Sequence, residues 1–489
     1  MTPRLLSSLF GPVLALLVAG CDTASDRPVE VAVIGDPGSP FVGGARLPLA
    51  AQLVRSATAE GLVGFDEQGR VIPALADRWI VTDDGLSYIF RLRDGTWPDK
   101  TPLTGDSARA ALQQAIGSVR GTPLGADLAG IDEVRAMAGR VVEIRLRQPQ
   151  PDFLQLLAQP ELGLMRKGRG AGPMRQTREK RALLLKPIPP EDRGLPQTED
   201  WAERSRKLRL VAMTAPRAVE RFNAGEADLV LGGRLADFPR LDASGIARGA
   251  IRLDPVAGLF GLAVVNPQGF LSAPERREAL AMAIDRDALG ATLNIGGWIA
   301  TTRIVNPGTG DDNGTVGERW PGQSLAERRT TAAARVTRWV KNGKTPRLRI
   351  ALPSGPGSDQ LFARLAEDFK AIGLDAVQVR DSAPADLRLV DTVARYPRAS
   401  WFLNQLSCAN MRVLCSASAD RLTGLALVES DPAKRADLLA QAEAQLTIAN
   451  SYIPLGVPIR WSLVSGKATG FMPNPWNIHP LMPLAMLPK

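Results

Sequence analysis

The amino-acid sequence predicts an α/β fold, and a strand–helix–strand pattern in its C-terminal half is the main reason. Residues 348–352 alternate between apolar and polar side chains, which is typical of a half-buried strand. Residues 361–372 then place apolar side chains at helical spacing, and Gly373 follows where a helix commonly ends. Residues 374–379 return to a strand pattern, so the segment is a building block of α/β folds.

Further strands and helices are expected along the chain. Residues 29–34 predict a first strand, residues 79–93 predict a hairpin around an Asp-Asp-Gly turn, and residues 141–146 predict another strand. One helix is expected over residues 276–289. A second is expected from Pro432 onward, because Asp431 is a good N-cap and proline is favoured at the first helical position. Residues 307–314 predict an exposed loop.

The N-terminal segment has the pattern of an export signal. Residues 9–19 are almost wholly apolar and follow the lone charge of Arg4, and the stretch is too short to span a membrane, which takes about 20 apolar residues. It ends in Val-Ala-Gly-Cys, which resembles the bacterial lipobox. The resemblance implies a lipoprotein signal peptide over residues 1–21, a diacylated Cys21, and an anchor on the periplasmic side of the inner membrane, where Asp22 favours retention. A plain signal peptide with an incidental cysteine is the alternative.

Cysteine usage agrees with export. The chain has three cysteines, Cys21, Cys408 and Cys415. If Cys21 carries lipid, an even pair remains, and an oxidising periplasm would allow that pair to form a disulfide. Closing so short a loop would stabilise the fold by roughly 2–3 kcal/mol. Two buried free thiols are the alternative.

The charge pattern does not favour nucleic-acid binding. The formal net charge is +9, but the charge is scattered and an exported protein does not meet nucleic acid. Residues 166–181 are the exception, with seven Lys or Arg against one Glu. This stretch is either a solvated loop near an anionic membrane surface or a rim that attracts anions.

No catalytic set can be recognised in the sequence. The one histidine, His479, lies in a proline-rich tail, where a structural role is expected, and it cannot build a zinc site with two oxidised cysteines. There is no Gly-x-Ser-x-Gly motif and no P-loop. The neighbouring carboxylates Asp83 and Asp84 are explained by the hairpin turn. We therefore expect neither an enzyme nor a metal or other cofactor.

Several ordered segments resemble the family 5 extracellular solute-binding proteins, which include dipeptide, oligopeptide and nickel binders. Residues 75–107 match the family pattern L-A-x-x-W, then D-G-x-x-Y-x-F-x-L-R, then most of W-x-D-G-x-P-x-T-A-x-D. Residues 217–230 and 277–289 resemble two later family segments, and Cys408 and Cys415 lie where dipeptide binders carry a short-range disulfide. Each piece is weak alone, but the ordered set covers nearly the whole mature chain.

The resemblance implies a fold like that of type II periplasmic binding proteins, with two lobes, a hinge, and a subdomain inserted into the first lobe. Residues 22–255 and 462–489 would form lobe I, with the inserted subdomain at about residues 45–150, and residues 256–461 would form lobe II. We expect a monomer that captures a small solute, peptide-like or other, in the cleft between its lobes. The solute would then pass to the permease subunits of an ABC importer.

The resemblance also assigns residues 390–402 to the ligand pocket. In the family's G-W-x-x-D-Y-x-D-P stretch, the first Asp holds the ammonium of a peptide, because a cation that leaves water needs a fixed anion. Here Tyr396 matches, but Arg395 and Arg398 stand at the two acidic positions. We therefore expect a pocket that disfavours a free ammonium and prefers an anionic or amine-blocked ligand. If the alignment slips, Asp391 supplies the acid instead.

The candidate ligand-binding residues are thus Arg395, Tyr396, Arg398, Trp401 and Asn404. Two other pocket segments, residues 170–174 and 353–359, also depart from the family pattern. The first hypothesis is therefore a transport receptor with a rebuilt pocket. The second is a transport-inactive lipoprotein of the same fold that serves as a sensor or interaction partner. An exported hydrolase is a third class, but it would need a nucleophile and base that the sequence does not offer.

Overall fold

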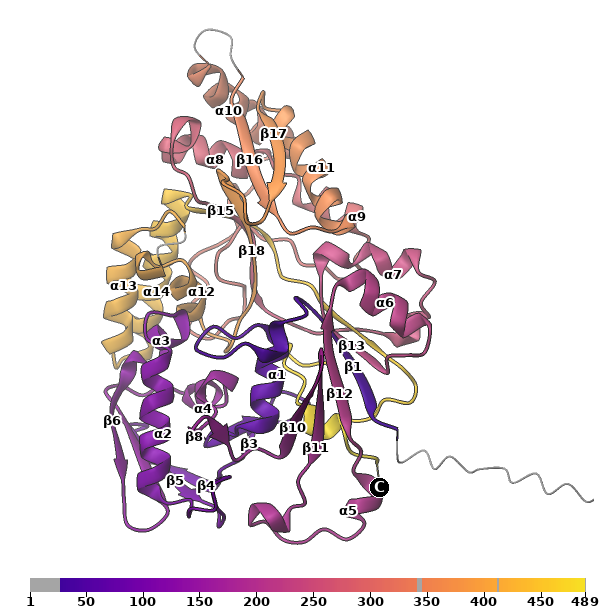
Figure 1. The fold of residues 1–489 in the computed structure, drawn as a ribbon. Helices are drawn as coiled ribbons and strands as arrows, with labels where there is room; N and C mark the ends of the chain where they lie inside the picture. Colours follow the sequence, from indigo (N-terminus) through magenta and orange to yellow (C-terminus); the bar gives the residue numbers. More distant parts are fainter. Residues whose placement is uncertain (1–26, 341–344, 411–412, 489) are drawn as a thin grey trace, which may run out of the picture.

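The computed structural model describes residues 27–340, 345–410 and 413–488, so Cys21 and the predicted signal peptide lie outside the described residues. The chain folds into two lobes that stand one above the other in Figure 1. Lobe I contains a seven-stranded sheet and a four-stranded sheet, and lobe II contains a five-stranded sheet. This arrangement confirms the predicted α/β class. None of the helices in the described ranges has the length and apolar character needed to cross a membrane.

The seven-stranded sheet forms the centre of lobe I. Its strands are, in order, β10 (Met174–Glu179), β11 (Ala182–Pro187), β12 (Leu208–Met213), β1 (Val29–Ile34), β13 (Leu229–Arg234), β20 (Arg460–Val464) and β14 (Ile251–Leu253). The predicted strand β1 pairs in parallel with β12 and β13 and is buried on both faces, which explains its run of Val and Ala. The helices that belong to this part of lobe I are α1 (Leu49–Thr58), α5 (Trp201–Arg204), α6 (Ala215–Asn223), α7 (Pro239–Ala243) and α15 (Leu481–Leu484).

The four-stranded sheet is inserted between β1 and β10. Its strands are, in order, β4 (Ala76–Val81), β5 (Ser87–Leu92), β7 (Val141–Leu146) and β6 (Ile131–Ala136). Strands β4 and β5 form the predicted hairpin, and Gly85 supplies the positive φ of 67° in its turn. The neighbouring elements are β2 (Val63–Phe65), β3 (Val71–Pro73), α2 (Gly105–Ser118), α3 (Pro123–Asp127), α4 (Phe153–Leu157), β8 (Met165–Arg166) and β9 (Arg169–Gly170).

The five-stranded sheet forms lobe II. Its strands are, in order, β17 (Asp375–Arg380), β16 (Arg347–Leu352), β18 (Leu387–Val393), β15 (Gly258–Val264) and β19 (Tyr452–Gly456). Strands β16 and β17 are parallel and joined by α11 (Pro356–Lys370), which confirms the predicted strand–helix–strand unit. Leu361, Leu365 and Phe369 form the fully buried face of α11, at the helical spacing seen in the sequence.

The helices of lobe II correct one prediction and confirm another. The remaining ones are α8 (Pro274–Ala283), α9 (Arg286–Leu293), α10 (Leu325–Trp339), α12 (Ala399–Gln405), α13 (Ala417–Val428) and α14 (Pro432–Ala449). The single helix expected over residues 276–289 is wrong, because the backbone becomes extended at Ile284 and the side chain of Asp285 caps a new helix through Ala288 N. Asp431 caps α14 as predicted.

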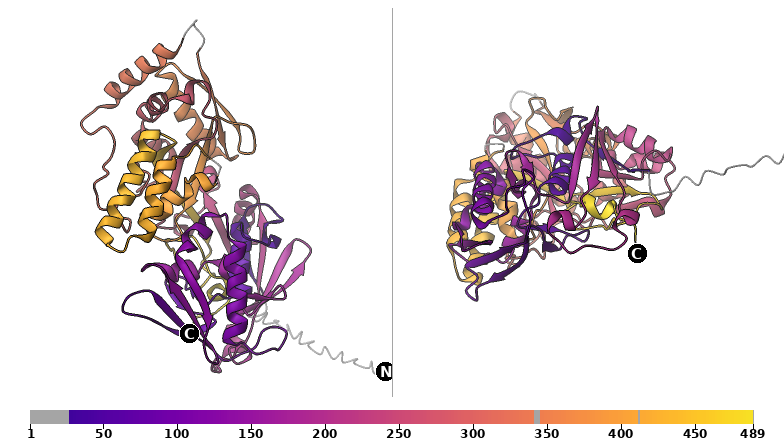
Figure 2. Two further views of the ribbon diagram at one scale, coloured as in Figure 1. Left: turned by 90° about the vertical axis from the view of Figure 1, so that its left-hand side faces the viewer. Right: turned by 60° about the horizontal axis from the view of Figure 1, so that its bottom comes forward.

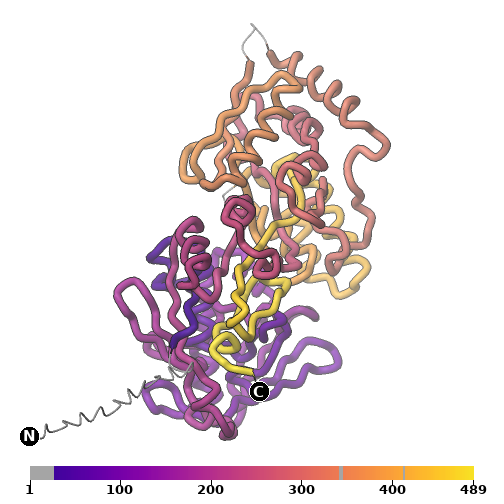
Figure 3. The backbone as a smooth tube through the Cα atoms, turned by 90° about the vertical axis from the view of Figure 1, so that its right-hand side faces the viewer, coloured from indigo at the N-terminus to yellow at the C-terminus, as the bar shows by residue number. Residues whose placement is uncertain are grey.

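The chain crosses between the lobes twice. It leaves β14 of lobe I and enters β15 of lobe II over residues 254–257, and it returns from β19 to β20 over residues 457–459. Figures 2 and 3 show the yellow C-terminal segment running down from lobe II into lobe I. The first crossing is held by Asp254, whose carboxylate accepts from Asn474 N and lies 3.1 Å from His479 Nε2. The buried His479 therefore has a structural contact beside the crossing, while the predicted lobe boundaries stay a prediction.

Candidate functional site

Helices of lobe II pack directly on the inserted subdomain of lobe I. Helix α12 contacts α3, and Figure 1 shows α12, α13 and α14 lying next to it. One apolar core continues across this contact, from Phe90 and Phe153 of lobe I to Phe402 and Leu439 of lobe II. The surface between the two lobes at this point is therefore a packed interface with a continuous core.

A cavity of about 310 Å³ lies within this interface. Lobe I contributes Ala126, Asp127, Ala129, Gly130 and residues 148–151 to its walls, and lobe II contributes Asp311 and residues from the segment 396–439. Among the predicted ligand-binding residues, Tyr396, Arg398 and Asn404 line the cavity. Its volume falls at the lower end of the range of small-molecule sites, about 300–1,000 Å³.

Asp127 is the most buried acidic group in the cavity wall. Its Oδ1 accepts hydrogen bonds from Tyr396 Oη at 2.8 Å and from Asn404 Nδ2 at 2.6 Å, so both donors come from lobe II. Its Oδ2 is buried and has no hydrogen-bond partner among the residues that the structure describes. Burial raises the pKa of the Asp127 carboxyl to about 7, although the two hydrogen bonds and the charge of Arg395 act in the opposite direction.

Arg395 is paired with a buried acid of lobe I. Its Nη1 and Nη2 donate to the two carboxylate oxygens of Glu161 at 2.8 and 2.9 Å, and Nη1 also donates to Gln159 Oε1. The side chain of Glu161 is only 2% exposed. Arg395 does not line the cavity, and its charge is met in a bidentate geometry, the strongest form of such a pair.

Arg398 is neutralised from two sides. It forms ion pairs with Asp152 of lobe I and with Asp311 of lobe II. Asp311 belongs to the segment 307–314, which is a largely exposed loop as predicted, but its own side chain is only 10% exposed, and the neighbouring Gly310 pairs with the backbone of Arg398. Both arginines thus have carboxylate partners, and the premise on which we expected an anion-preferring pocket does not hold.

The other residues of the predicted pocket segment are also engaged. Asp391, the alternative acid, lies on β18 and accepts from Arg460 Nη1 at 2.6 Å, so it is paired with a cation of the returning crossing strand. Trp401 is 1% exposed, packs edge-on against Phe402 and does not line the cavity. The three acids Asp127, Asp152 and Glu161 come from lobe I segments whose sequence pattern carries no functional signal.

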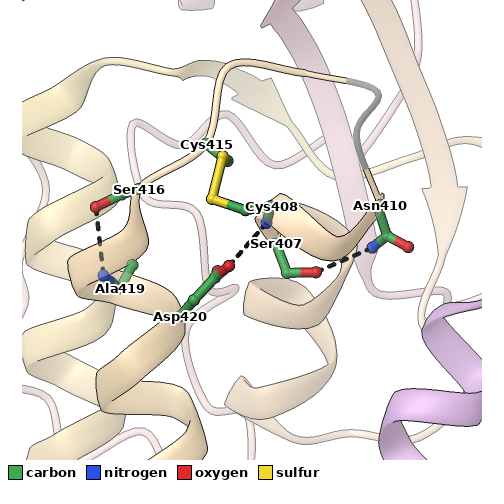
Figure 4. Close-up of a disulfide and its surroundings, with 7 residues drawn as sticks. All are labelled: Ser407, Cys408, Asn410, Cys415, Ser416, Ala419 and Asp420. Carbon is green, nitrogen blue, oxygen red and sulfur yellow. Dashed lines mark hydrogen bonds between the residues drawn. A yellow bond between two sulfur atoms is a disulfide. The ribbon is translucent and has the colours of Figure 1, made fainter. Parts of the chain in front are cut away.

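The predicted disulfide joins Cys408 and Cys415 beside the cavity. Figure 4 shows it in the connection between α12 and α13, where Asp420 accepts a hydrogen bond from Cys408 N at 2.8 Å and Ser416 caps α13. Asp420 itself lines the cavity. The disulfide therefore fixes the turn that places one wall of the cavity.

A second, larger cavity of about 890 Å³ lies within lobe I. It is lined by residues 40–44, by helix α1, and by part of the basic stretch 166–181. Five cationic side chains line it without an ion-pair partner in the described part of the chain: Arg55, Lys100, Arg169, Arg175 and Arg178. The basic stretch therefore faces a cavity, which is the geometry expected of a rim that attracts anions. No group of three or more potential metal ligands occurs in the described ranges.

Comparison with known proteins agrees with this fold. Residues 70–180 match the model of bacterial extracellular solute-binding proteins, family 5 Middle. A stretch of 132 residues is 36% identical to the probable deoxycholate-binding periplasmic protein YgiS of Escherichia coli, covering 23% of this chain and 24% of that protein. OppA of Haemophilus influenzae, in complex with RPPGFSPFR, superposes with a TM-score of 0.80 at 16% identity, covering 95% of this chain and 100% of OppA.

The murein tripeptide binding protein MppA of Escherichia coli adds information on lobe arrangement. One MppA structure superposes with a TM-score of 0.80 at 19% identity, covering 95% of this chain and 99% of MppA. The unliganded open form of MppA gives only 0.63 at similar coverage. The chain therefore superposes better on the first of these structures than on the open form. The fold is that of two-lobed periplasmic binding proteins such as OppA and MppA. Residues 70–180 carry the sequence match to the family 5 extracellular solute-binding proteins.

Proposed function

We propose that this chain is the solute-binding component of an ABC importer and captures a small solute between its lobes. The observation that carries the proposal is the interlobe cavity, whose walls come from both lobes. A solute that contacts both walls would favour the closed arrangement over the open one by its differential affinity for the two. The solute is peptide-like or another small organic molecule, in keeping with the relatives named as peptide-binding and deoxycholate-binding.

The proposal can be tested with the chain that lacks residues 1–21. The purified protein should release a small molecule on denaturation, identifiable by mass spectrometry. Adding that molecule back to the emptied protein should reduce the radius of gyration in solution scattering, because binding-protein lobes close around ligand by hinge motion. A protein that carries nothing and keeps one radius in every solute pool tested would contradict the proposal.

One observation favours the second hypothesis, a transport-inactive lipoprotein. Arg395 and Arg398 of lobe II are bound to Glu161 and Asp152 of lobe I, so the lobes are bridged by ion pairs within the chain itself. Such bridges would reduce the dependence of closure on a solute. The scattering experiment separates the hypotheses, because a sensor or interaction partner of this type would be compact before any solute is added.

We further propose that Cys21 is acylated and anchors the protein on the periplasmic side of the inner membrane. Two acyl chains hold a protein stably, since each buried CH₂ contributes about 0.8 kcal/mol. Replacing Cys21 by Ala should move the protein from the membrane fraction to the soluble fraction or leave an uncleaved precursor, as seen by fractionation and intact mass. The double variant Cys408→Ser, Cys415→Ser is the matched control and should stay with the membrane. An unchanged mass and distribution of Cys21→Ala would refute the anchor.

A further inference from the structure

Of the carboxylates in the interlobe cavity wall, Asp311 is paired with arginine, whereas Asp127, Asp420 and Glu429 have only neutral donors in the described part of the chain. Asp311 is paired with Arg398 and lies 3.6 Å from Arg435 Nε. Asp420 accepts a backbone N–H, and Glu429 accepts the N–H of Asp431 at the rim. Asp127 has only neutral donors, the Tyr396 hydroxyl and the Asn404 amide, and both bind the same oxygen.

The second oxygen of Asp127 is the atom that distinguishes it from the other acids of the cavity wall. Asp127 is 2% exposed, and its Oδ2 is buried without a hydrogen-bond partner among the described residues. The nearest cation, Arg395, is already held by both oxygens of Glu161 and does not reach it. Buried polar atoms are nearly always paired in folded proteins, so an unpaired carboxylate oxygen in a cavity wall indicates a position for a donor that comes from outside the chain.

The remainder of the cavity wall is largely apolar. The apolar residues that line it include Ala126, Ala129, Pro149, Leu403, Leu427 and Leu439. A ligand that fills this space must therefore bury carbon against these side chains while it presents a donor to Asp127. The volume of about 310 Å³ limits it to a compact molecule.

We propose that Asp127 anchors the protonated amine of a small apolar amine in the interlobe cavity. The proposal rests on the proposed function and names the class of solute that this cavity takes. A free amine and the N-terminus of a short apolar peptide share this chemistry. A charged amine donates to a carboxylate more strongly than an alcohol or amide donor does, because both partners are ionised. The raised pKa of Asp127 is consistent with this role, since an incoming cation would restore the ionised form.

Calorimetry on the chain lacking residues 1–21 tests the proposal with defined probes. The probes are 2-phenylethylamine, N-acetyl-2-phenylethylamine, 2-phenylethanol, the dipeptide Phe-Ala and N-acetyl-Phe-Ala. The wild type should bind at least one free amine no less than tenfold more tightly than its acetylated counterpart. Preference for the free amine over the dipeptide, or the reverse, distinguishes the two sources. Asp127→Asn, which keeps the shape and removes the charge, should abolish the preference.

Two further variants keep the test decisive. Asp437→Asn is the matched control, because Asp437 is an exposed acid of α14 outside the cavity wall, and it should keep the amine preference. Leu427→Trp places bulk on a cavity residue that is 40% exposed, and it should weaken every amine without loss of folding. Equal binding of free and acetylated probes, an Asp127→Asn variant that keeps the preference, or no binding of any probe would overturn the inference. The mass-spectrometry experiment on the released molecule tests the proposed function separately. A bound solute that has no amine would support the proposed function and contradict the amine inference.

Discussion

Replacing Glu161 by Gln should lower the free energy of unfolding by about 3 kcal/mol, because the change leaves Arg395 without its anion in a largely buried interface. Glu161 is 2% exposed and accepts from both terminal nitrogens of Arg395, whose side chain is 28% exposed, so water replaces the lost carboxylate only in part. Because Glu161 belongs to lobe I and Arg395 to lobe II, the loss should also favour the open arrangement. Urea unfolding monitored by circular dichroism measures the first effect, and solution scattering measures the second.

An exposed pair provides the control for this measurement. Arg217 and Glu220 lie 2.7 Å apart on α6, with side chains that are 60% and 64% exposed. Glu220→Gln should change the free energy of unfolding by less than about 1 kcal/mol, since water screens such pairs. The double variant Arg395→Met, Glu161→Leu should recover most of the stability, because replacing both charges removes the unpaired ion. If Glu161→Gln and Glu220→Gln have equal effects, the Arg395 bridge does not hold the lobes.

The regular elements of the fold could be predicted because their signals are local. Residues 348–352 alternate with the period of a strand, and Leu361, Leu365 and Phe369 repeat with the period of a helix, so α11 and its strands were evident. The break between α8 and α9 was missed because the apolar spacing continues across it. The cap at Asp285 was the only local signal, and aspartate is common inside helices as well as at their ends.

The partners of the pocket segment could not be predicted in the same way. The acids that bind Arg395 and Arg398 lie 234, 246 and 87 residues away in the sequence. Nothing in their local pattern distinguishes them from surface carboxylates, and a change from acid to arginine in one segment does not reveal an acid in another. The sequence therefore indicated that this segment lies between the lobes. It could not indicate that carboxylates from other segments neutralise Arg395 and Arg398.

The pocket segment of this chain differs from the family pattern in where its acid lies. In the family pattern, an acid of this segment binds the ammonium of a ligand. In this chain, Arg395 occupies that sequence position and meets Glu161 of the opposite lobe, so a cation–carboxylate contact of this kind is made within the protein. The acid with a buried, unpaired oxygen is instead Asp127, on a different helix, and it lies beside rather than within the predicted segment.

The pH dependence of stability should reveal Asp127 even without a ligand. Its pKa is raised from the ordinary 3.8 to about 7 by burial, so the folded protein binds this proton more tightly than the unfolded chain does. The stabilising contribution is fully present below about pH 4 and is lost as the pH rises through 7. A difference of about three pKa units corresponds to about 4 kcal/mol.

The expected result is a difference between the pH–stability curves of the wild type and of Asp127→Asn, because other groups titrate in both proteins. Among the groups near Asp127, Arg395 and Arg398 stay charged throughout, and Tyr396 stays neutral because burial raises its pKa well above its ordinary value. The remaining acids of the cavity wall, Asp311, Asp420 and Glu429, are present in wild type and variant alike. Urea unfolding of the ligand-free wild type and of Asp127→Asn at pH 4.5 and pH 8 should therefore show the wild type losing about 3 kcal/mol relative to the variant as the pH rises, the part of the shift that this pH range spans. Parallel curves would mean that Asp127 is ionised in the folded protein throughout this range, and that a cation already balances its charge.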